Sequence, residues 1–129
     1  MSLQRSTQLT GRRIFVVEDE YFLADDIGET FRSLGAEVAG PVGDLHDALQ
    51  ILNDGSALDG AVLDVNIRSE MIFSIARELK ARQVPFLFTT GYDSVSVSPE
   101  FQDVPILEKP IDLAAMAGTL ATLMADPAS

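Results

Sequence analysis

The sequence contains no cysteine, a single histidine and few basic residues. Without cysteine the chain can form no disulfide, no thiolate nucleophile and no cysteine-based zinc site. His46 has no second candidate ligand nearby, and we expect it to lie on the surface of a helix. Nine basic residues oppose 20 acidic ones, and the net charge of −11 argues against direct binding to nucleic acid or to an anionic membrane surface. This charge suits a cation site or a basic partner surface.

Long apolar runs and phosphate-binding loops are missing too. No run approaches the ~20 apolar residues that a membrane-spanning helix needs, and no signal-peptide pattern opens the chain. A cytoplasmic protein is therefore expected. The glycine-rich loops of P-loop and Rossmann proteins are absent, which argues against nucleotide binding by those routes. The length of 129 residues and the 47% of hydrophobic residues predict one globular domain.

Short apolar runs alternate along the chain with segments of helical periodicity. This alternation predicts an α/β protein in which helices cover both faces of a five-stranded parallel sheet. The segment Asp93–Asp103 shows no helical stripe, so we expect an irregular loop or a single turn there. Residues 1–11 and 126–129 are expected to be flexible tails. The expected strands are Ile14–Val17, Glu37–Gly40, Ala61–Leu63, Val84–Thr89 and Val104–Leu107, and the expected helices are Tyr21–Leu34 and the segments capped by Asp44, Ser69 and Asp112.

Polar residues follow four of the five expected strands. Right-handed crossovers place the carboxyl ends of all strands at one edge of the sheet, where ligands bind in open α/β folds. Asp64 follows a strand buried on both faces, where a carboxylate is costly without a partner. Considered alone, Asp64 is equally well explained as a structural acid and as a site residue. The run Glu18–Glu20, considered alone, is better explained as a solvated face or the start of a helix. The residues gathered at the edge are Glu18, Asp19, Glu20, Asp64, Asn66, Thr90 and Lys109.

The gathered side chains suit phosphoryl chemistry. Carboxylates about 4 Å apart repel by about 4 kcal/mol per pair at an effective dielectric constant near 20, which a bound cation relieves. Oxygen ligands without histidine or cysteine select a hard cation, and Mg²⁺ is the expected one. Such an ion beside the hydroxyl of Thr90 and the ammonium of Lys109 forms a site for a phosphoryl group. The carboxylate of Asp64 would then be the nucleophile.

Four segments, VVEDE, VLDVNI, TTGY and EKP, resemble in order and position the receiver domain of bacterial two-component response regulators. The resemblance covers residues 12–125 and implies a flavodoxin-like (βα)₅ fold of strand order 2-1-3-4-5. It also implies that Asp64 accepts phosphate from the histidine of a sensor kinase. Thr90 and Lys109 would contact the phosphoryl group, and the Lys109–Pro110 peptide bond would be cis. The implied Mg²⁺ ligands are Asp19, Asp64, Glu18 through water and the backbone carbonyl of Asn66.

The segment FTTGYD, residues 88–93, further resembles the motif of the FATGUY subfamily of receivers, with Thr89 in place of the alanine of the motif. The loose segment with Pro99 matches that subfamily too. One departure concerns Ile106, which stands where most receivers carry an aromatic switch residue. We therefore expect Tyr92, or ordering of the segment Asp93–Asp103, to carry the signal. Tyr92 and Asn66 are also expected to slow hydrolysis of the phosphoryl group, although Tyr92 is equally well explained as a surface aromatic.

The resemblance implies a stand-alone receiver that works as a phosphorylation-controlled protein-binding switch. It would be phosphorylated by a sensor histidine kinase or phosphotransfer protein, and would bind its target through the face of residues 93–103, the fifth strand and the last helix. It would not be an enzyme acting on an outside substrate. One alternative is a pseudo-receiver that binds partners independently of phosphorylation. Another is a small aspartate-nucleophile phosphatase, which Asn66 disfavours because an amide is a poor proton donor. Asp126-Pro127 could also open a linker in a longer regulator.

Overall fold

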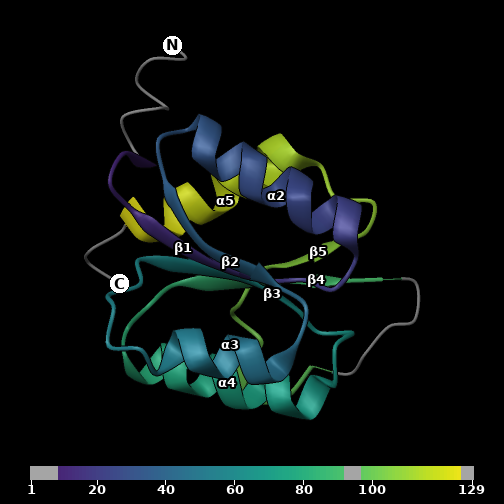
Figure 1. Ribbon diagram of the computed structural model, residues 1–129. Coiled ribbons are helices and arrows are strands. Elements are labelled where there is room, and N and C mark those ends of the chain that lie inside the picture. Colours follow the sequence, from purple (N-terminus) through teal and green to yellow (C-terminus); the bar gives the residue numbers. More distant parts are fainter. Residues whose placement is uncertain (1–8, 92–96, 126–129) are drawn as a thin grey trace.

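The computed structural model describes residues 9–91 and 97–125, and its strands form one parallel sheet of order β2-β1-β3-β4-β5 (Figure 1). The predicted fold class and strand order are confirmed. The central strand β3 has all five residues buried, as expected for a strand covered on both faces. The strands are β1 (Arg13–Val17), β2 (Glu37–Val42), β3 (Gly60–Asp64), β4 (Phe86–Thr90) and β5 (Ile106–Glu108).

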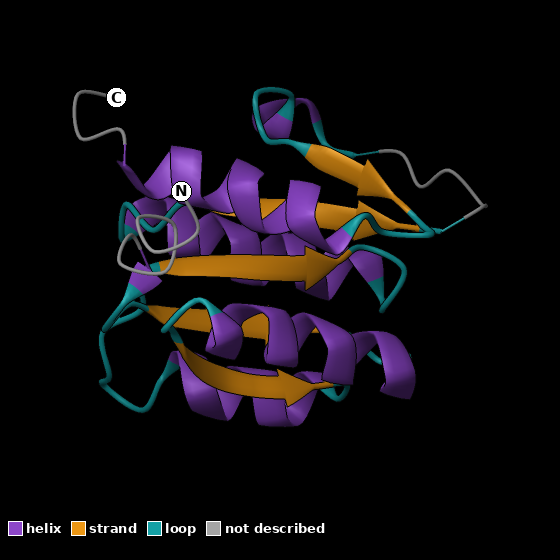
Figure 2. Ribbon diagram, turned by 90° about the horizontal axis from the view of Figure 1, so that it is seen from above, coloured by secondary structure: helices purple, strands orange, loops and turns teal. Residues whose placement is uncertain are grey.

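Four helices form layers on the two faces of the sheet (Figures 1 and 2). Helices α2 (Tyr21–Ser33) and α5 (Leu113–Ala125) cover one face, and α3 (Leu45–Leu52) and α4 (Ser69–Ala81) cover the other. Among these described helices, none is both long and apolar enough to cross a membrane.

Aspartate side chains begin two of the helices, as predicted. Asp44 Oδ1 accepts a hydrogen bond from the backbone N–H of His46 at 2.6 Å, and Asp112 Oδ1 accepts one from that of Ala115 at 3.0 Å. The predicted cap by Ser69 is wrong. Helix α4 instead follows Arg68, whose φ of 36° turns the chain into the helix without a side-chain cap.

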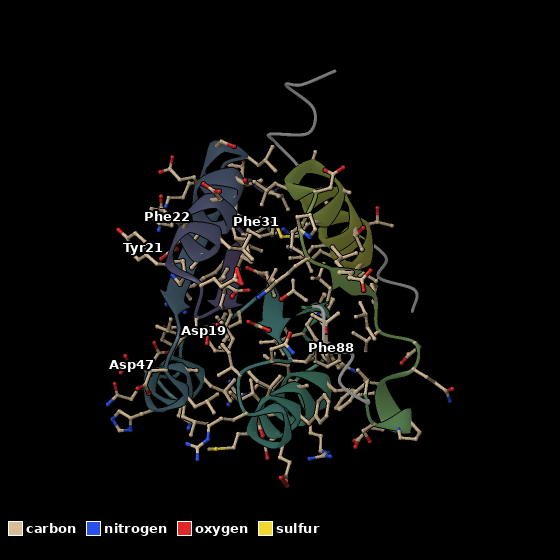
Figure 3. All side chains as sticks on the ribbon, turned by 90° about the vertical axis from the view of Figure 1, so that its right-hand side faces the viewer. Asp19, Tyr21, Phe22, Phe31, Asp47 and Phe88 are labelled. Atoms are coloured by element: carbon tan, nitrogen blue, oxygen red, sulfur yellow. The ribbon has the colours of Figure 1, made fainter. Side chains whose placement is uncertain are left out.

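The core divides into two layers, one on each side of the sheet. Phe31 belongs to the layer under α2 and α5, whereas Phe88 belongs to the layer above α3 and α4 (Figure 3). Alternate residues of each strand feed the two layers: in β3, Val62 packs toward α2 and α5, while Ala61 and Leu63 pack toward α3 and α4. Two residues of a strand that are two positions apart therefore face the same helical layer.

Three strand boundaries differ from the prediction by two residues, and one of them is the start of β4, which lies at Phe86 rather than at Val84. Strand β2 continues to Val42 because the carbonyl of Val42 accepts a hydrogen bond from the backbone N–H of Glu18 at 2.9 Å. The predicted fifth strand begins two residues too early. Pro105 has no N–H for the ladder, although its carbonyl still accepts from Phe88 at 2.9 Å, and β5 begins at Ile106.

The predicted N-terminal tail includes residues that pack against the domain. Leu9 is 2% exposed and packs against the layer under α2 and α5, and the Gly11 N–H donates to the carbonyl of Gly35. The boundary placed after residue 11 is therefore too late for Leu9. Residues 1–8 and 126–129 of the predicted tails lie outside the described residues.

The segment between β4 and β5 has a single 3₁₀ turn in its described part, η1 (Pro99–Phe101), in agreement with the prediction of a single turn. Two contacts fix this turn to α4. The Arg77 guanidinium binds the Glu100 carboxylate at 2.8–3.0 Å, and Lys80 Nζ donates to the Glu100 carbonyl at 2.8 Å. Phe101 is fully buried and contacts three other rings edge-on or tilted, those of Phe73, Phe86 and Phe88.

Replacing Phe101 tests how strongly η1 is anchored. We expect Phe101→Ala to lower the free energy of unfolding by about 3–5 kcal/mol, because it removes a buried ring and leaves a cavity among aromatic neighbours. The measurement is equilibrium urea denaturation. Phe22→Ala is the matched control, since the Phe22 ring is 80% exposed and should contribute within about 0.5 kcal/mol. Equal losses in the two variants would contradict the anchoring of η1 by Phe101.

Candidate functional site

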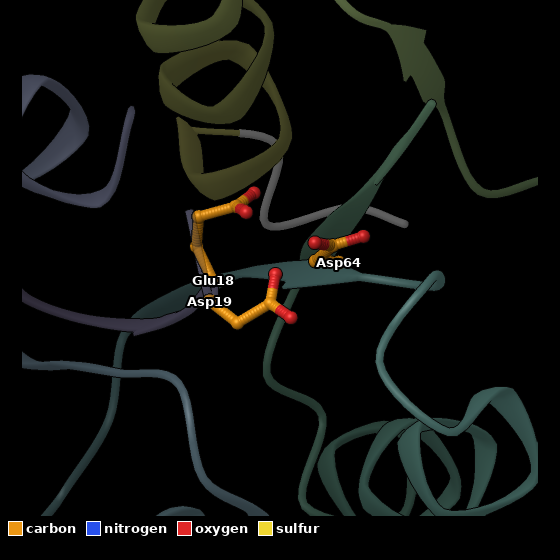
Figure 4. A group of neighbouring side chains, drawn as sticks. All are labelled: Glu18, Asp19 and Asp64. Carbon is orange, nitrogen blue, oxygen red and sulfur yellow. The ribbon is translucent and has the colours of Figure 1, made fainter. Parts of the chain in front are cut away.

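Three acidic side chains meet at the carboxyl ends of β1 and β3 (Figure 4). Glu18, Asp19 and Asp64 each offer a carboxylate oxygen, and these oxygens all lie within 4.8 Å of one another. The side chains of Glu18 and Asp64 have no exposed surface, whereas Asp19 is exposed between the two helical layers (Figure 3). The structure therefore brings together the acids that the sequence placed at one edge of the sheet.

Lys109 supplies the positive charge inside this cluster. Its Nζ lies 3.1 Å from Asp64 Oδ2, 3.2 Å from Glu18 Oε2 and 3.5 Å from Glu20 Oε1. Burial alone would lower the pKa of Lys109, but the attraction of the Glu18 and Asp64 carboxylates outweighs it and raises the pKa above its ordinary value. The lysine is therefore held as an ammonium. The cis Lys109–Pro110 bond that the resemblance implied is present.

Glu18 is the most perturbed acid of the cluster. Burial, together with the neighbouring carboxyl group of Asp64, raises the pKa of Glu18 to about 7, although a hydrogen bond from the Glu20 N–H at 3.0 Å and the charge of Lys109 act in the opposite direction. Glu18 Oε1 is buried and makes no hydrogen bond to any described residue. The cluster is short of positive charge even with Lys109 in place.

Short loops hold the cluster in position. The backbone N–H of Asn66 donates to Asp64 Oδ1 at 2.8 Å, and the Asn66 side-chain carbonyl accepts from the Gly91 N–H at 2.5 Å. The loops after β3 and β4 are thereby joined. Gly43 approaches the backbone of Asp19 so closely that a Cβ there would lie 2.9 Å from Asp19 Cα. A side chain at position 43 would displace the exposed acid.

Thr90 ends β4 at the same sheet edge, and its Oγ1 is buried without a hydrogen-bond partner among the described residues. Tyr92, to which the sequence assigned a part in signalling, lies outside the described residues, and its role stays a prediction. Sequence reasoning placed Glu20 at this edge but did not anticipate its contact with Lys109. It treated Thr89, which is fully buried and pairs with Asp64 in the sheet, only as a departure from a motif.

The donor set fits a magnesium ion. All three candidate side-chain ligands are carboxylates, no histidine lies among them, and hard divalent cations prefer such all-oxygen sites. The acids also outnumber the single ammonium, so a cation would relieve both the repulsion between them and the unpaired state of Glu18 Oε1. Glu18, Asp19 and Asp64 would hold the ion, with Lys109 sharing two of the carboxylates.

The sequence matches no protein-family model and no curated protein, but many solved structures resemble the chain. SdrG from Sphingomonas melonis Fr1 is 37% identical over 91% of this chain and 98% of that chain, with a TM-score of 0.75. Its BeF₃-activated conformation, recorded from Pseudomonas melonis Fr1, is 37% identical over 87% and 95%, with a TM-score of 0.68. A response regulator receiver protein from Sinorhizobium medicae WSM419 is 25% identical over 88% of this chain and 94% of that chain, with a TM-score of 0.70. The receiver domain of the hybrid histidine kinase CckA is 27% identical over 87% of this chain and 98% of that chain, with a TM-score of 0.69.

The raised pKa of Glu18 predicts an unusual dependence of stability on pH. The carboxyl group binds its proton more tightly in the folded protein, where its pKa is about 7, than in the unfolded chain, where the ordinary value is 4.5. The stability of the metal-free protein should therefore fall as the pH rises from about 5 through 7. We expect Glu18→Gln to be more stable than the wild type at pH 8 by on the order of 1–3 kcal/mol, with little advantage near pH 5.

Urea denaturation in chelator at several pH values measures this difference. Glu20→Gln is the matched control, because its carboxylate also contacts Lys109 but is 59% exposed, and its stability should follow the wild-type pH dependence. Parallel stability curves for Glu18→Gln and the wild type between pH 5 and 8 would show that Glu18 is ordinarily ionised.

Proposed function

The chain belongs to the receiver-domain family of response regulators, and we propose that it is a Mg²⁺-dependent phosphoacceptor of the FATGUY subfamily, with Asp64 as the phosphorylated residue. The observation that carries the proposal is the buried Asp64 carboxylate, flanked by two further acids and held 3.1 Å from the Lys109 ammonium. The phosphoryl donor would be the phosphohistidine of a sensor kinase or phosphotransfer protein. The BeF₃-activated conformation of SdrG supports this reading by analogy.

In the proposed transfer, one carboxylate oxygen of Asp64 attacks phosphorus in line with the bond to the donor nitrogen. The P–O bond to Asp64 forms as the P–N bond breaks, and the donor imidazole keeps the electron pair. The Asn66 N–H, bonded to Asp64 Oδ1, fixes the orientation of the nucleophile. A bound Mg²⁺ would neutralise developing charge on the phosphoryl oxygens. Lys109 and the unpaired hydroxyl of Thr90 would bind those oxygens as they become available.

The switch would act through the surface next to the site. Thr90 and Lys109 are linked by a backbone hydrogen bond from the Lys109 N–H to the Thr90 carbonyl at 2.8 Å, so movement of either reaches both β4 and β5. Ile106 on β5 is 43% exposed and can contact a partner directly. We propose that η1, β5 and α5 form the face for a downstream protein, and that Tyr92, or ordering of the segment Asp93–Asp103, carries the signal in place of an aromatic switch residue.

A phosphorylation-independent binding module is the second candidate. It is disfavoured because such a module gains nothing from a buried acid pair that costs stability, yet Glu18 and Asp64 are both fully buried at the site. Phosphatase chemistry on an outside substrate is disfavoured too. The residue two positions after Asp64 is Asn66, whose amide cannot act as an acid and already accepts from Gly91.

Intact-mass spectrometry tests the phosphoacceptor directly. After incubation with Mg²⁺ and acetyl phosphate we expect the wild type to gain one phosphate and Asp64→Asn to gain none, because the variant lacks the nucleophilic oxygen. Asp25→Asn, on the exposed side of α2, is the matched control and should gain phosphate like the wild type. Labelling of Asp64→Asn at the wild-type rate would place the phosphoacceptor elsewhere.

Magnesium binding is tested without phosphorylation. A ligand that binds only the folded state raises the melting temperature, so MgCl₂ should stabilise the wild type in a concentration-dependent way. Asp19→Asn should need an at least tenfold higher Mg²⁺ concentration for the same rise in melting temperature. The substitution removes an exposed carboxylate ligand and leaves the buried pair intact. Asp25→Asn serves again as the control. Equal Mg²⁺ responses of Asp19→Asn and the wild type would exclude Asp19 as a ligand.

A further inference from the structure

Glu18, Asp64 and Thr89 lie in one row across three adjacent strands. Val17 pairs with Leu63 and Asp64 pairs with Thr89 in the register of the sheet, so the three residues are neighbours at the same level. Alternation places them on one side as well. Val16, Val62 and Leu87, each two residues earlier on its strand, all pack in the layer under α2 and α5.

Lys109 reaches into the same row from β5. Thr89 pairs with Leu107, and Leu107 also packs in the layer under α2 and α5. Lys109, two residues further, therefore starts on the same side, and its ammonium contacts both Glu18 and Asp64. To reach β3 and β1 from β5, the lysine side chain has to cross the strand between them, which is β4 at the level of Thr89 and Thr90.

The Thr89 hydroxyl is an unpartnered polar group in this position. Thr89 is fully buried, and its Oγ1 makes no hydrogen bond to any residue in the described part of the chain. A buried hydroxyl without a partner destabilises a protein, and valine would fill the same volume without that cost. A threonine that costs stability beside a reactive carboxylate therefore indicates a state of the site in which the hydroxyl is bonded.

The ammonium of Lys109 needs such a partner when the site is phosphorylated. It has three N–H donors, which now face the carboxylates of Glu18, Glu20 and Asp64. On the proposed function, one Asp64 oxygen becomes bonded to phosphorus and Glu18 turns to the cation, so two of the three acceptors are lost. A phosphoryl oxygen replaces one of them. A neutral acceptor beside β4 would replace the other.

We propose that Thr89 is a positioning residue, whose hydroxyl oxygen accepts a hydrogen bond from Lys109 Nζ in the phosphorylated state and holds the ammonium against the phosphoryl group. This inference rests on the proposed function and adds a residue to it. The role requires the oxygen at Oγ1, and either threonine or serine provides it.

Three substitutions at one position test the proposal with acetyl phosphate and Mg²⁺. We expect Thr89→Val to lower the rate of phosphate gain, followed by intact mass, about fivefold, the effect of losing one ordinary hydrogen bond. Thr89→Ala should behave in the same way, and Thr89→Ser should restore the rate to within about twofold of the wild type. Without phosphodonor, Thr89→Val should melt at or above the wild-type temperature, so the slower reaction would not come from a weakened fold.

A second readout reports on the ammonium itself. With BeF₃⁻ and Mg²⁺ bound, the ammonium protons of Lys109, followed by ¹H–¹⁵N NMR, should exchange slowly with water in the wild type and in Thr89→Ser. Their exchange rate should be higher in Thr89→Val. Equal labelling rates in the wild type and Thr89→Val, or a serine variant as slow as the valine variant, would overturn the inference while leaving Asp64 as the phosphoacceptor. A wild type that gains no phosphate would overturn the proposed function and this inference together.

Discussion

Charge balance at one edge of the sheet is the constraint on which this structure depends. Glu18 and Asp64 have no exposed side-chain surface, and a buried carboxylate without a partner costs several kcal/mol. One ammonium, that of Lys109, serves both. Strands β1, β3 and β5 are thus tied to one another by charge as well as by packing. The layer under α2 and α5 must leave room for the lysine to cross β4 at the level of Thr89 and Thr90.

The same carboxylate oxygens serve two possible counter-ions. A cation held by Glu18, Asp19 and Asp64 would compete with Lys109 for the carboxylates of Glu18 and Asp64. Binding of the cation would therefore turn the lysine ammonium toward other acceptors. Because the Lys109 N–H is bonded to the Thr90 carbonyl, a redirected lysine would act on the ends of both β4 and β5. Such a coupling would need no aromatic side chain on β5, where Ile106 stands.

Much of the site could be predicted from the sequence because topology alone gathers strand ends at one edge. Glu18, Asp64 and Lys109 meet as expected, and β3 is buried as its apolar run indicated. Three features escaped because they depend on geometry that spacing does not encode. The contact between Glu20 and Lys109 depends on where the two side chains lie, β2 extends to Val42 because its pairing with β1 shifts register after Ala39, and Thr89 lies in the acid row only through its pairing with Asp64.

The lysine that balances the acids comes late in the chain. Glu18 and Lys109 are 91 residues apart, and a ribosome that adds roughly 5–20 residues per second needs about 5–18 seconds to make the second after the first. During that interval Glu18 and then Asp64 are synthesised while Lys109, their counter-ion, is still missing. Closing β1 and β3 over two charged carboxylates would then require protonation or a cation from solution. Closure of this edge during synthesis would then wait for Lys109, unless Glu18 is protonated or a cation occupies the acids first.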